Sequence, residues 1–225
     1  MPLFSPLAPA TFVVETITAL PSSKPNNNNA TSAARAAAAA LLHNHAAMIE
    51  LNPLVESYAL CDPDDAAAAS LPPPDPSSVA GAVAEGQQQH QHQHQQHEEA
   101  SATYRITDTL PLLPGGLWSS RTTYAARFVD RADGGLETVV RAALGVESRS
   151  VWVVSSSAED KGAGEGEKLL LRETATVTCP WAVKAFVEGT IRKAHKELGH
   201  AFVERLERGD AAEPVGKKEK KKGSW

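Results

Sequence analysis

The sequence predicts an α+β fold: a curved antiparallel sheet of about six or seven strands, a short helical segment near its start and a long helix at its end. Two observations predict it. Apolar residues recur every three or four positions between Trp181 and Arg208, the spacing of one face of an α-helix. Before this helix, strand-like segments follow one another from residue 102 to residue 177 without an intervening helix. Strands in a run, with helices segregated to the ends, are typical of α+β folds.

The first part of the chain supplies a strand, a helical segment and a second strand. Thr11–Ala19 is rich in β-branched residues and alternates, so we predict the first strand there. The alanine-rich segment Ser32–Glu50 favours a helix, with Thr31 or Ser32 as its cap. The Asn52-Pro53 step ends this helix, because a residue before proline avoids the α region. Leu54–Cys61 is the second predicted strand.

The remaining strands are predicted to follow one another as an antiparallel meander. They are Ala102–Leu110, Trp118–Val129, Leu136–Val146, Ser150–Ser156 and Leu169–Val177. Turn residues separate them, and Glu147-Ser148-Arg149 is the turn that we expect between the third and the fourth of these strands.

Three segments have compositions that are not typical of a packed core. Residues 62–100 are rich first in Ala and Pro and then in Gln and His, which predicts a disordered insertion. Residues 1–10 and 211–225 are predicted to be tails, and the second of them is basic. We therefore expect one domain over residues 11–210, interrupted by the insertion.

The charge of the chain is unevenly distributed. The formal net charge is −5, whereas the run Lys217–Lys222 alone carries +4 from five lysines and one glutamate, which leaves −9 for the rest. Without this run the chain is strongly acidic, and we therefore expect no nucleic-acid partner, because binding to phosphates needs clustered Lys and Arg. We expect the basic run to be solvated; weak contact with an anionic membrane surface, or a nuclear address, is the alternative.

The sequence favours a cytoplasmic protein without metal or cofactor. It lacks the basic start and apolar core of a signal peptide, and no run of about 18 apolar residues predicts a membrane span. Cys61 and Cys179 stand far apart, so free thiols are expected, with a disulfide as the alternative. No two histidines on the predicted helices are three or four residues apart, as chelation of one ion would require.

The order of elements resembles that of the START-like or Bet v 1-like superfamily. Thr11–Ala19, the segment His43–Val55 and Lys168–Arg208 carry the resemblance. The junction Ile49–Val55 (IELNPLV) is similar to the passage from second helix to second strand in polyketide-cyclase-like members, and the chain resembles an uncharacterised fungal family within the superfamily. The resemblance implies a helix-grip fold, a bend in the first helical segment, and an apolar cavity between the sheet and the final helix for a lipid, sterol or aromatic molecule.

Alternation along the strands divides the predicted sheet into two faces. The apolar face carries Tyr104, Ile106, Trp118, Tyr124, Phe128, Leu136, Val140, Leu144, Leu169, Leu171, Ala175 and Val177. The opposite face carries Arg105, Arg121, Arg127, Glu137, Arg141 and Arg172, which should meet water. The inward candidates on the final helix are Phe186, Thr190, Ala194 and Leu198. The predicted ligand-binding residues are Tyr104, Ile106, Trp118, Tyr124, Phe128, Val140, Leu171, Glu173, Phe186, Thr190 and Leu198; filling of a dry core is the alternative for each.

Three acidic residues interrupt the apolar face: Glu56, Asp108 and Glu173. A buried carboxylate is costly unless it is paired, and it can orient a ligand hydroxyl or act as a general acid or base. The alternatives are structural: Glu56 faces outward, Asp108 lies at a strand end, and Glu173 pairs with an arginine. Asp108 and Glu173 are the candidates for catalysis, and Glu173 in mid-strand is the more interesting.

The leading hypothesis is a non-enzymatic protein that binds or carries a hydrophobic small molecule between the sheet and the final helix. One alternative is an enzyme similar to polyketide cyclases that uses a cavity carboxylate or a histidine. Another is a protein-interaction module similar to the chaperone-activating members, with residues 62–100 and the basic tail as docking segments.

Overall fold

The computed structural model describes residues 8–21, 28–62, 65, 70–72, 101–111, 119–157 and 168–209. The strands are β1 (Pro9–Ala19), β2 (Val55–Leu60), β3 (Ser101–Pro111), β4 (Ser119–Asp130), β5 (Leu136–Ala142), β6 (Val146–Ser156) and β7 (Leu169–Pro180). The helices are α1 (Asn28–Leu42), α2 (His45–Leu51) and α5 (Lys184–Arg208), with the short turns η2 (Ala143–Gly145) and η4 (Trp181–Val183). Residues 1–7 and 210–225, most of the predicted insertion and Trp118 lie outside the described residues. Pro9 and Ala10, which were predicted to belong to the first tail, are part of β1.

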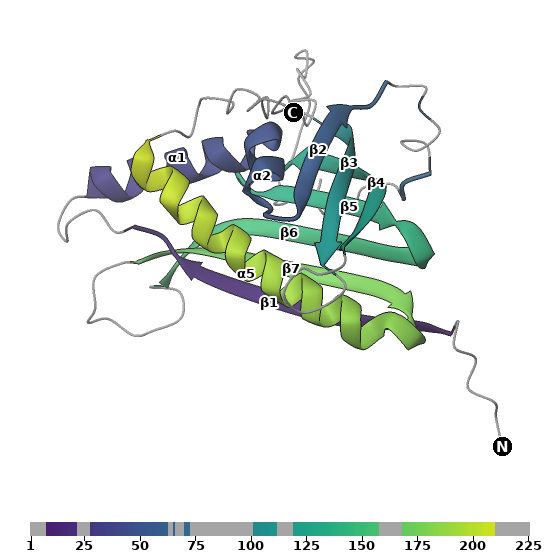
Figure 1. Ribbon diagram of the computed structural model, residues 1–225. Coiled ribbons are helices and arrows are strands. Elements are labelled where there is room, and N and C mark those ends of the chain that lie inside the picture. The colour runs from purple at the N-terminus through teal and green to yellow at the C-terminus, as the bar shows by residue number, and fades with distance from the viewer. Residues whose placement is uncertain are drawn as a thin grey trace, which may run out of the picture.

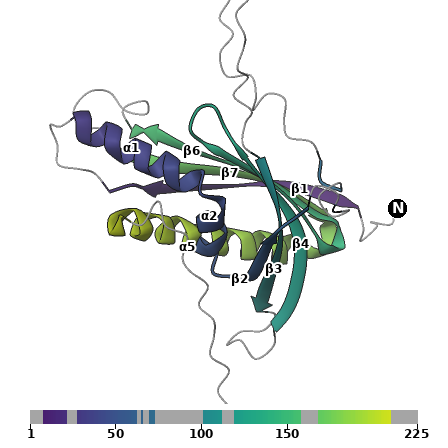
Figure 2. The same ribbon diagram turned by 90° about the horizontal axis from the view of Figure 1, so that it is seen from above.

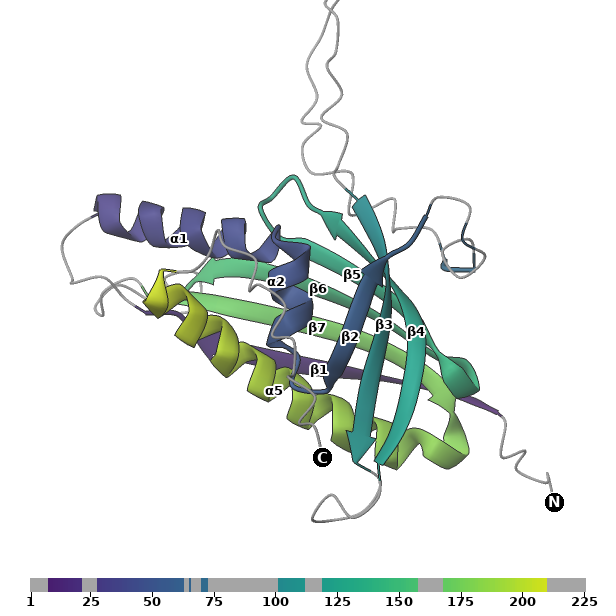
Figure 3. The same ribbon diagram turned by 45° about the horizontal axis from the view of Figure 1, so that its top comes forward.

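One antiparallel sheet holds all seven of these strands, in the order β1-β7-β6-β5-β4-β3-β2 (Figure 1). The first and last strands are therefore neighbours, and the sheet curves around one side that the helices cover. The long helix α5 runs beside β1 and across this side (Figure 2). Figure 3 shows α2 between β2 and α5, on the same side of the sheet. The predicted α+β, helix-grip architecture is confirmed.

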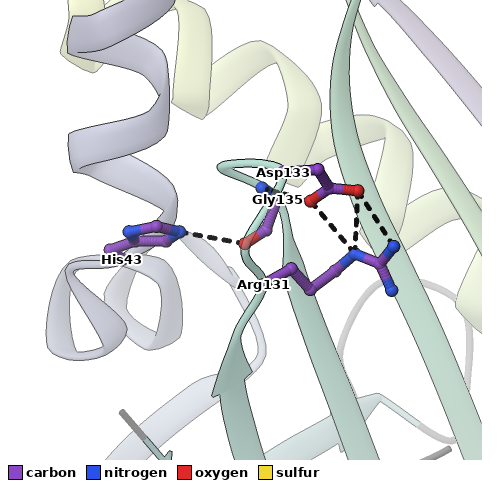
Figure 4. A network of polar contacts seen from close by, with 4 residues as sticks. All are labelled: His43, Arg131, Asp133 and Gly135. Atoms are coloured by element: carbon purple, nitrogen blue, oxygen red, sulfur yellow. Dashed lines mark hydrogen bonds and ion pairs between the residues drawn. The ribbon is translucent and has the colours of Figure 1, made fainter. Parts of the chain in front are cut away.

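The first helical segment bends at His43 and Asn44. The Asn44 side chain caps α2 by accepting a hydrogen bond from the Ala47 amide at 3.1 Å, which starts a new helix within a sequence of high helix propensity. The bend is tied to the β4–β5 turn, because the His43 Nε2 donates to the Gly135 carbonyl at 3.0 Å (Figure 4). In that turn, Asp133 accepts from the Gly135 amide and pairs with Arg131 at 2.9 Å. A side chain at Gly135 would meet the Trp152 carbonyl, so only glycine fits.

The predicted turn at Glu147-Ser148-Arg149 is wrong. These residues belong to β6 and pair with β5, and the connection is η2, four residues earlier. Leu144 and Gly145 adopt positive φ values of 62° and 73°, which make the connection tight. Glycine tolerates this conformation, but leucine gives no sequence signal for it, and so the strand was expected to continue through the turn.

The expectation that Glu137 meets water is also wrong. Its side chain lies on the outer face of the sheet but is 0% exposed, and it accepts a hydrogen bond from Arg149 at 2.6 Å. Residues 70–72, from the predicted insertion, lie on the same outer face beside Arg127 and Arg141. Leu71 is buried, and the Pro72 carbonyl accepts a hydrogen bond from Arg127 at 2.9 Å. The alternation of residues along β5 carries no information on a contact with a segment this far away in the sequence, so the burial of this face could not be predicted from it.

Two clusters of buried side chains form the core. The larger joins α1 and α2 to the middle of the sheet and to the C-terminal half of α5, with Phe202 at its centre. The smaller lies between β1, β7 and the N-terminal half of α5. Between these clusters the helix does not fill the space above the sheet, and a cavity results.

Candidate ligand cavity

The cavity has a volume of about 310 Å³ and lies between the inner face of the sheet, α2 and the N-terminal half of α5. The sheet contributes Val55, Ile106, Asp108, Thr122, Tyr124, Ala126, Phe128, Thr138, Val140, Ala142, Val146, Ser148, Ser150, Trp152 and Glu173. The helices and turns contribute Met48, Ile49, Asn52, Leu54, Ala143, Leu144, Val183, Phe186, Val187, Thr190, Ile191, Ala194, His195 and Leu198. Most of these side chains are apolar. Alternation places every second residue of β3 to β6 inside.

Exposed apolar side chains mark where the cavity meets solvent. Leu144 of η2 and Phe186 of α5 both line the cavity, yet they are 75% and 47% exposed. The cavity therefore opens between the β5–β6 connection and the first turns of α5. An apolar molecule entering there would meet apolar side chains first.

The predicted ligand-binding residues divide into three groups. Those that line the cavity are Ile106, Tyr124, Phe128, Val140, Glu173, Phe186, Thr190 and Leu198. Tyr104 and Leu171 lie outside the lining: the Tyr104 ring packs against the rings of His45 and Phe128, and Leu171 is buried in the larger core cluster. These two side chains lie on the inner face, but in its part that α1 and α2 fill. Trp118 belongs to the residues that the structure does not describe.

Glu173 is the most deeply buried charged group in the cavity wall. Its side chain is 1% exposed, and its Oε1 lies 2.6 Å from the Nδ1 of His195 on α5. His195 is therefore the partner of Oε1, whereas Oε2 has no hydrogen-bond donor among the described residues. The Trp152 and His195 rings lie 6.2 Å apart between their centroids. The structural alternative for Glu173 was a pairing with an arginine. The partner is instead a histidine, which reaches Glu173 from the helix on the opposite side of the cavity.

Asp108 forms a second polar position, on β3. The Tyr124 hydroxyl donates to its Oδ2 at 2.9 Å, while its Oδ1 has no hydrogen-bond donor among the described residues. Burial raises the pKa of Asp108 above its ordinary value, and the hydrogen bond from Tyr124 works in the opposite direction. Burial, and then the charge of Asp108, raise the pKa of Tyr124 well above its ordinary value. The strand-end alternative for Asp108 is wrong, because β3 continues to Pro111.

Glu56 takes no part in the cavity. It is exposed, pairs with Arg121 and accepts a hydrogen bond from the Thr109 hydroxyl at 2.9 Å, as the outward-facing alternative expects. The ladder between β2 and β3 is irregular between Val55 and Ser57. This irregularity breaks the alternation that would otherwise direct Glu56 inward.

A buried ion pair closes the end of the molecule beyond the cavity. Arg205 of α5 is 3% exposed and lies 3.4 Å from Glu50 of α2, which also accepts a hydrogen bond from the Tyr58 hydroxyl at 2.9 Å. Burial, followed by the neighbouring Glu50, raises the pKa of Tyr58 to about 12. Sequence reasoning did not single out Arg205, because its partner is 155 residues away. The cluster holds the helices together and contributes no cavity wall.

The family model described as "Domain of unknown function (DUF7053)" matches residues 9–208. The chain belongs to the DUF7053 family. The match includes all the described strands and helices, and thus both walls of the cavity. No curated protein matches this DUF7053 chain.

Solved structures similar to this DUF7053 chain have the Bet v 1-like fold. Norcoclaurine synthase from Thalictrum flavum in complex with dopamine and hydroxybenzaldehyde is 10% identical, with a TM-score of 0.48 and 90% of each chain covered. Ara h 8.0201 is 11% identical, with a TM-score of 0.38, over 87% of this chain and 99% of that one. A putative uncharacterized protein from Rhizobium leguminosarum is 14% identical, with a TM-score of 0.33, over 89% and 95%. Likenesses this distant say nothing of ligand or reaction, and the fungal origin stays a prediction.

Among the described residues of this DUF7053 chain, no helix is long and apolar enough to cross a membrane. Over the same residues, no three side chains of His, Cys, Asp or Glu come together as metal ligands would. Cys61 and Cys179 are free thiols. The cavity is therefore the feature on which we base a function.

Proposed function

We propose that this DUF7053 protein binds a hydrophobic small molecule in the cavity between the sheet and α5. The observation that carries the proposal is an apolar space of about 310 Å³ under α5, open at Leu144 and Phe186. Small-molecule sites are typically about 300–1,000 Å³, mostly apolar, with a few polar groups that orient the ligand. The space fits this description at the lower end of the range.

The buried carboxylate at the cavity wall supports binding rather than a dry core. The Oε2 of Glu173 has no hydrogen-bond donor among the described residues, and a buried acceptor without a donor costs about 1–3 kcal/mol. A ligand that reaches Glu173 offsets part of this cost.

Filling the cavity tests the proposal. Ala194 lines the cavity, whereas Ala185 lies exposed on the same helix, so tryptophan at the two positions makes a matched pair. We expect the neutral fluorescent probe N-phenyl-1-naphthylamine to bind the delipidated wild type and Ala185→Trp, and to bind Ala194→Trp at least about tenfold more weakly. Circular dichroism establishes that both variants fold. Absence of saturable binding to the wild type, or equal binding by both variants, contradicts the proposal.

Acid–base catalysis is the second candidate, as in an enzyme similar to polyketide cyclases. The observation that favours it is the 2.6 Å approach of His195 to Glu173 within an apolar cavity. A carboxylate positioned there can take a proton from a carbon next to a carbonyl group, which becomes an enolate, and can then return the proton.

Hydrogen exchange distinguishes catalysis from carriage. In D₂O, an enzyme of this kind would accelerate deuterium incorporation into a bound aromatic β-diketone such as 1-benzoylacetone, observed by NMR. Glu173→Gln should remove the acceleration, because an amide cannot take the proton. Probes that bind without accelerated exchange leave carriage as the function.

We also propose that the protein acts in the cytoplasm. The two free thiols are in keeping with a reducing compartment. Fluorescence microscopy of the tagged full-length chain tests this location, and a nuclear signal that depends on Lys217–Lys222 would favour the alternative.

A further inference from the structure

The polar groups of the cavity limit the chemistry of its ligand, and this inference rests on the proposed binding function. Two carboxylate oxygens in the wall have no hydrogen-bond donor among the described residues: the Oε2 of Glu173, whose Oε1 lies against His195, and the Oδ1 of Asp108. Glu173 is buried to nine-tenths or more and borders the cavity directly. A donor that arrives with the ligand can satisfy these acceptors.

The charges of the wall point in the same direction. Among the described residues that line the cavity there are two acids and one histidine, and none is lysine or arginine. Whenever Glu173 is ionised, the wall therefore carries no net positive charge, even with His195 protonated. A ligand carboxylate entering this space would lose its hydration, and no lysine or arginine of the described wall would compensate for that loss.

We propose that the cavity selects ligands whose apolar body carries a hydrogen-bond donor, a hydroxyl group or a protonated amine, and that it rejects carboxylates. Glu173 is the main acceptor, because it is the more buried acid and its Oε2 lacks a donor among the described residues. Asp108 is a second acceptor, whose other oxygen the Tyr124 hydroxyl already occupies. It lies four strands from Glu173, about 19 Å along the curved sheet at a strand spacing of about 4.8 Å. A short ligand therefore meets one acid at a time.

Four probes with one ring system measure this selectivity. Naphthalene is the apolar parent, and 1-naphthylmethanol, 1-naphthylmethylamine and 1-naphthoic acid add a neutral donor, a cationic donor and an anion. By calorimetry at pH 7, we expect the amine and the alcohol to bind more tightly than naphthalene. The acid should bind about tenfold or more weakly than the alcohol, the order of effect expected for an unpaired charge.

Glu173→Gln tests the residue. The ratio of amine affinity to naphthalene affinity should fall about tenfold, because the charged acceptor is lost, while the relative affinity of the acid should rise. Glu147→Gln is the control: it changes the net charge equally, but Glu147 pairs with Arg141 at 2.7 Å and does not line the cavity. We expect Glu147→Gln to keep the wild-type order.

The outcomes separate the two proposals. The selectivity is overturned if naphthalene binds and the acid binds as tightly as the amine. It is also overturned if Glu173→Gln leaves the ranking of the four probe affinities unchanged. Either result leaves binding of an apolar molecule intact. Failure of the wild type to bind naphthalene and all three derivatives overturns the binding function itself.

Discussion

The two halves of α5 have the same amphipathic spacing, but they contact the sheet differently. In the C-terminal half, Phe202 is 0% exposed, and Gly199 lies so close to β1 that an added Cβ would stand 2.4 Å from the Thr18 Oγ1. In the N-terminal half, Phe186 is half exposed, and Thr190 and His195 border the cavity. One half closes a packed core, and the other half covers an open space.

The difference comes from what lies opposite each half. Leu41, Leu42 and Met48 of α1 and α2 extend the core toward the C-terminal half. Opposite the N-terminal half, the inner face of β4 and β6 carries small side chains such as Ala126, Ser148 and Ser150, which leave the cavity volume unfilled. An amphipathic stripe therefore predicts that a helix covers a sheet, but the opposing side chains decide whether a cavity forms.

Truncation of one phenylalanine in each half should give the largest contrast. Phe202→Ala empties a fully buried site and should lower the free energy of unfolding by about 3–5 kcal/mol. Phe186→Ala should lower it by less than about 1 kcal/mol and instead weaken binding of an apolar probe. Urea denaturation measures the first quantity and probe fluorescence the second. Equal losses of stability would abolish the distinction between the halves.

The two glycines of α5 should respond in opposite directions to alanine. Gly199→Ala should destabilise the fold by about 1–2 kcal/mol, because the new methyl group meets Thr18. Gly189 has no atom within 4 Å of an added Cβ, so Gly189→Ala should stabilise by up to about 1 kcal/mol through helix propensity. Thermal melting gives both values. If the contact is the cause, Thr18→Ala should restore part of the loss in the Gly199→Ala background.

The buried ion pair of the C-terminal half should make a smaller contribution that can be separated from packing. Tyr58→Phe removes the hydrogen bond to Glu50 and should cost about 1 kcal/mol. Tyr58 should also resist ionisation, with a pKa of about 12, when tyrosinate absorbance is followed during alkaline titration. Ionisation near 10 while the protein is still folded would contradict this description of the site.

The smallest effect is expected from the second acid of the cavity, and its sign depends on pH. Burial raises the pKa of Asp108 in the folded state. The stability linked to this carboxyl group is therefore fully present below its pKa in the unfolded chain, near 3.8, and is lost as the pH rises through its pKa in the folded protein. Asp108→Asn should therefore stabilise the protein at pH 7 by less than about 1 kcal/mol. The gain should vanish below pH 3.8 in melting experiments. A gain that is independent of pH would show that ionisation is not its cause.

Local sequence patterns predicted most of the fold and much of the cavity wall. Periodicity placed the strands and the long helix, and alternation brought Ile106, Tyr124 and Val140 to the face that lines the cavity. These properties depend on neighbours along the chain, which a single sequence displays.

The features that were not predicted depend on contacts between distant segments. Glu137 is buried on the outer face and pairs with Arg149 of the neighbouring strand, and Glu173 meets His195 only because α5 crosses β7. The β5–β6 connection was misplaced for a different reason, since a leucine with positive φ carries no signal in its residue type. The polar chemistry of the cavity was therefore harder to predict than its apolar wall.

The pairing of the first strand with the last has a consequence for folding during synthesis on the ribosome. Ala19 pairs with Leu170 and Pro9 with Pro180, so β1 finds its partner only after more than 150 further residues have been made. At about 5–20 residues per second, that interval is on the order of 10–30 seconds. Throughout it, β1 carries Val13 and Ile17 without the strand that will hold it in the sheet. The nascent chain has no finished cavity, and we expect it to depend on protection from aggregation until β7 emerges.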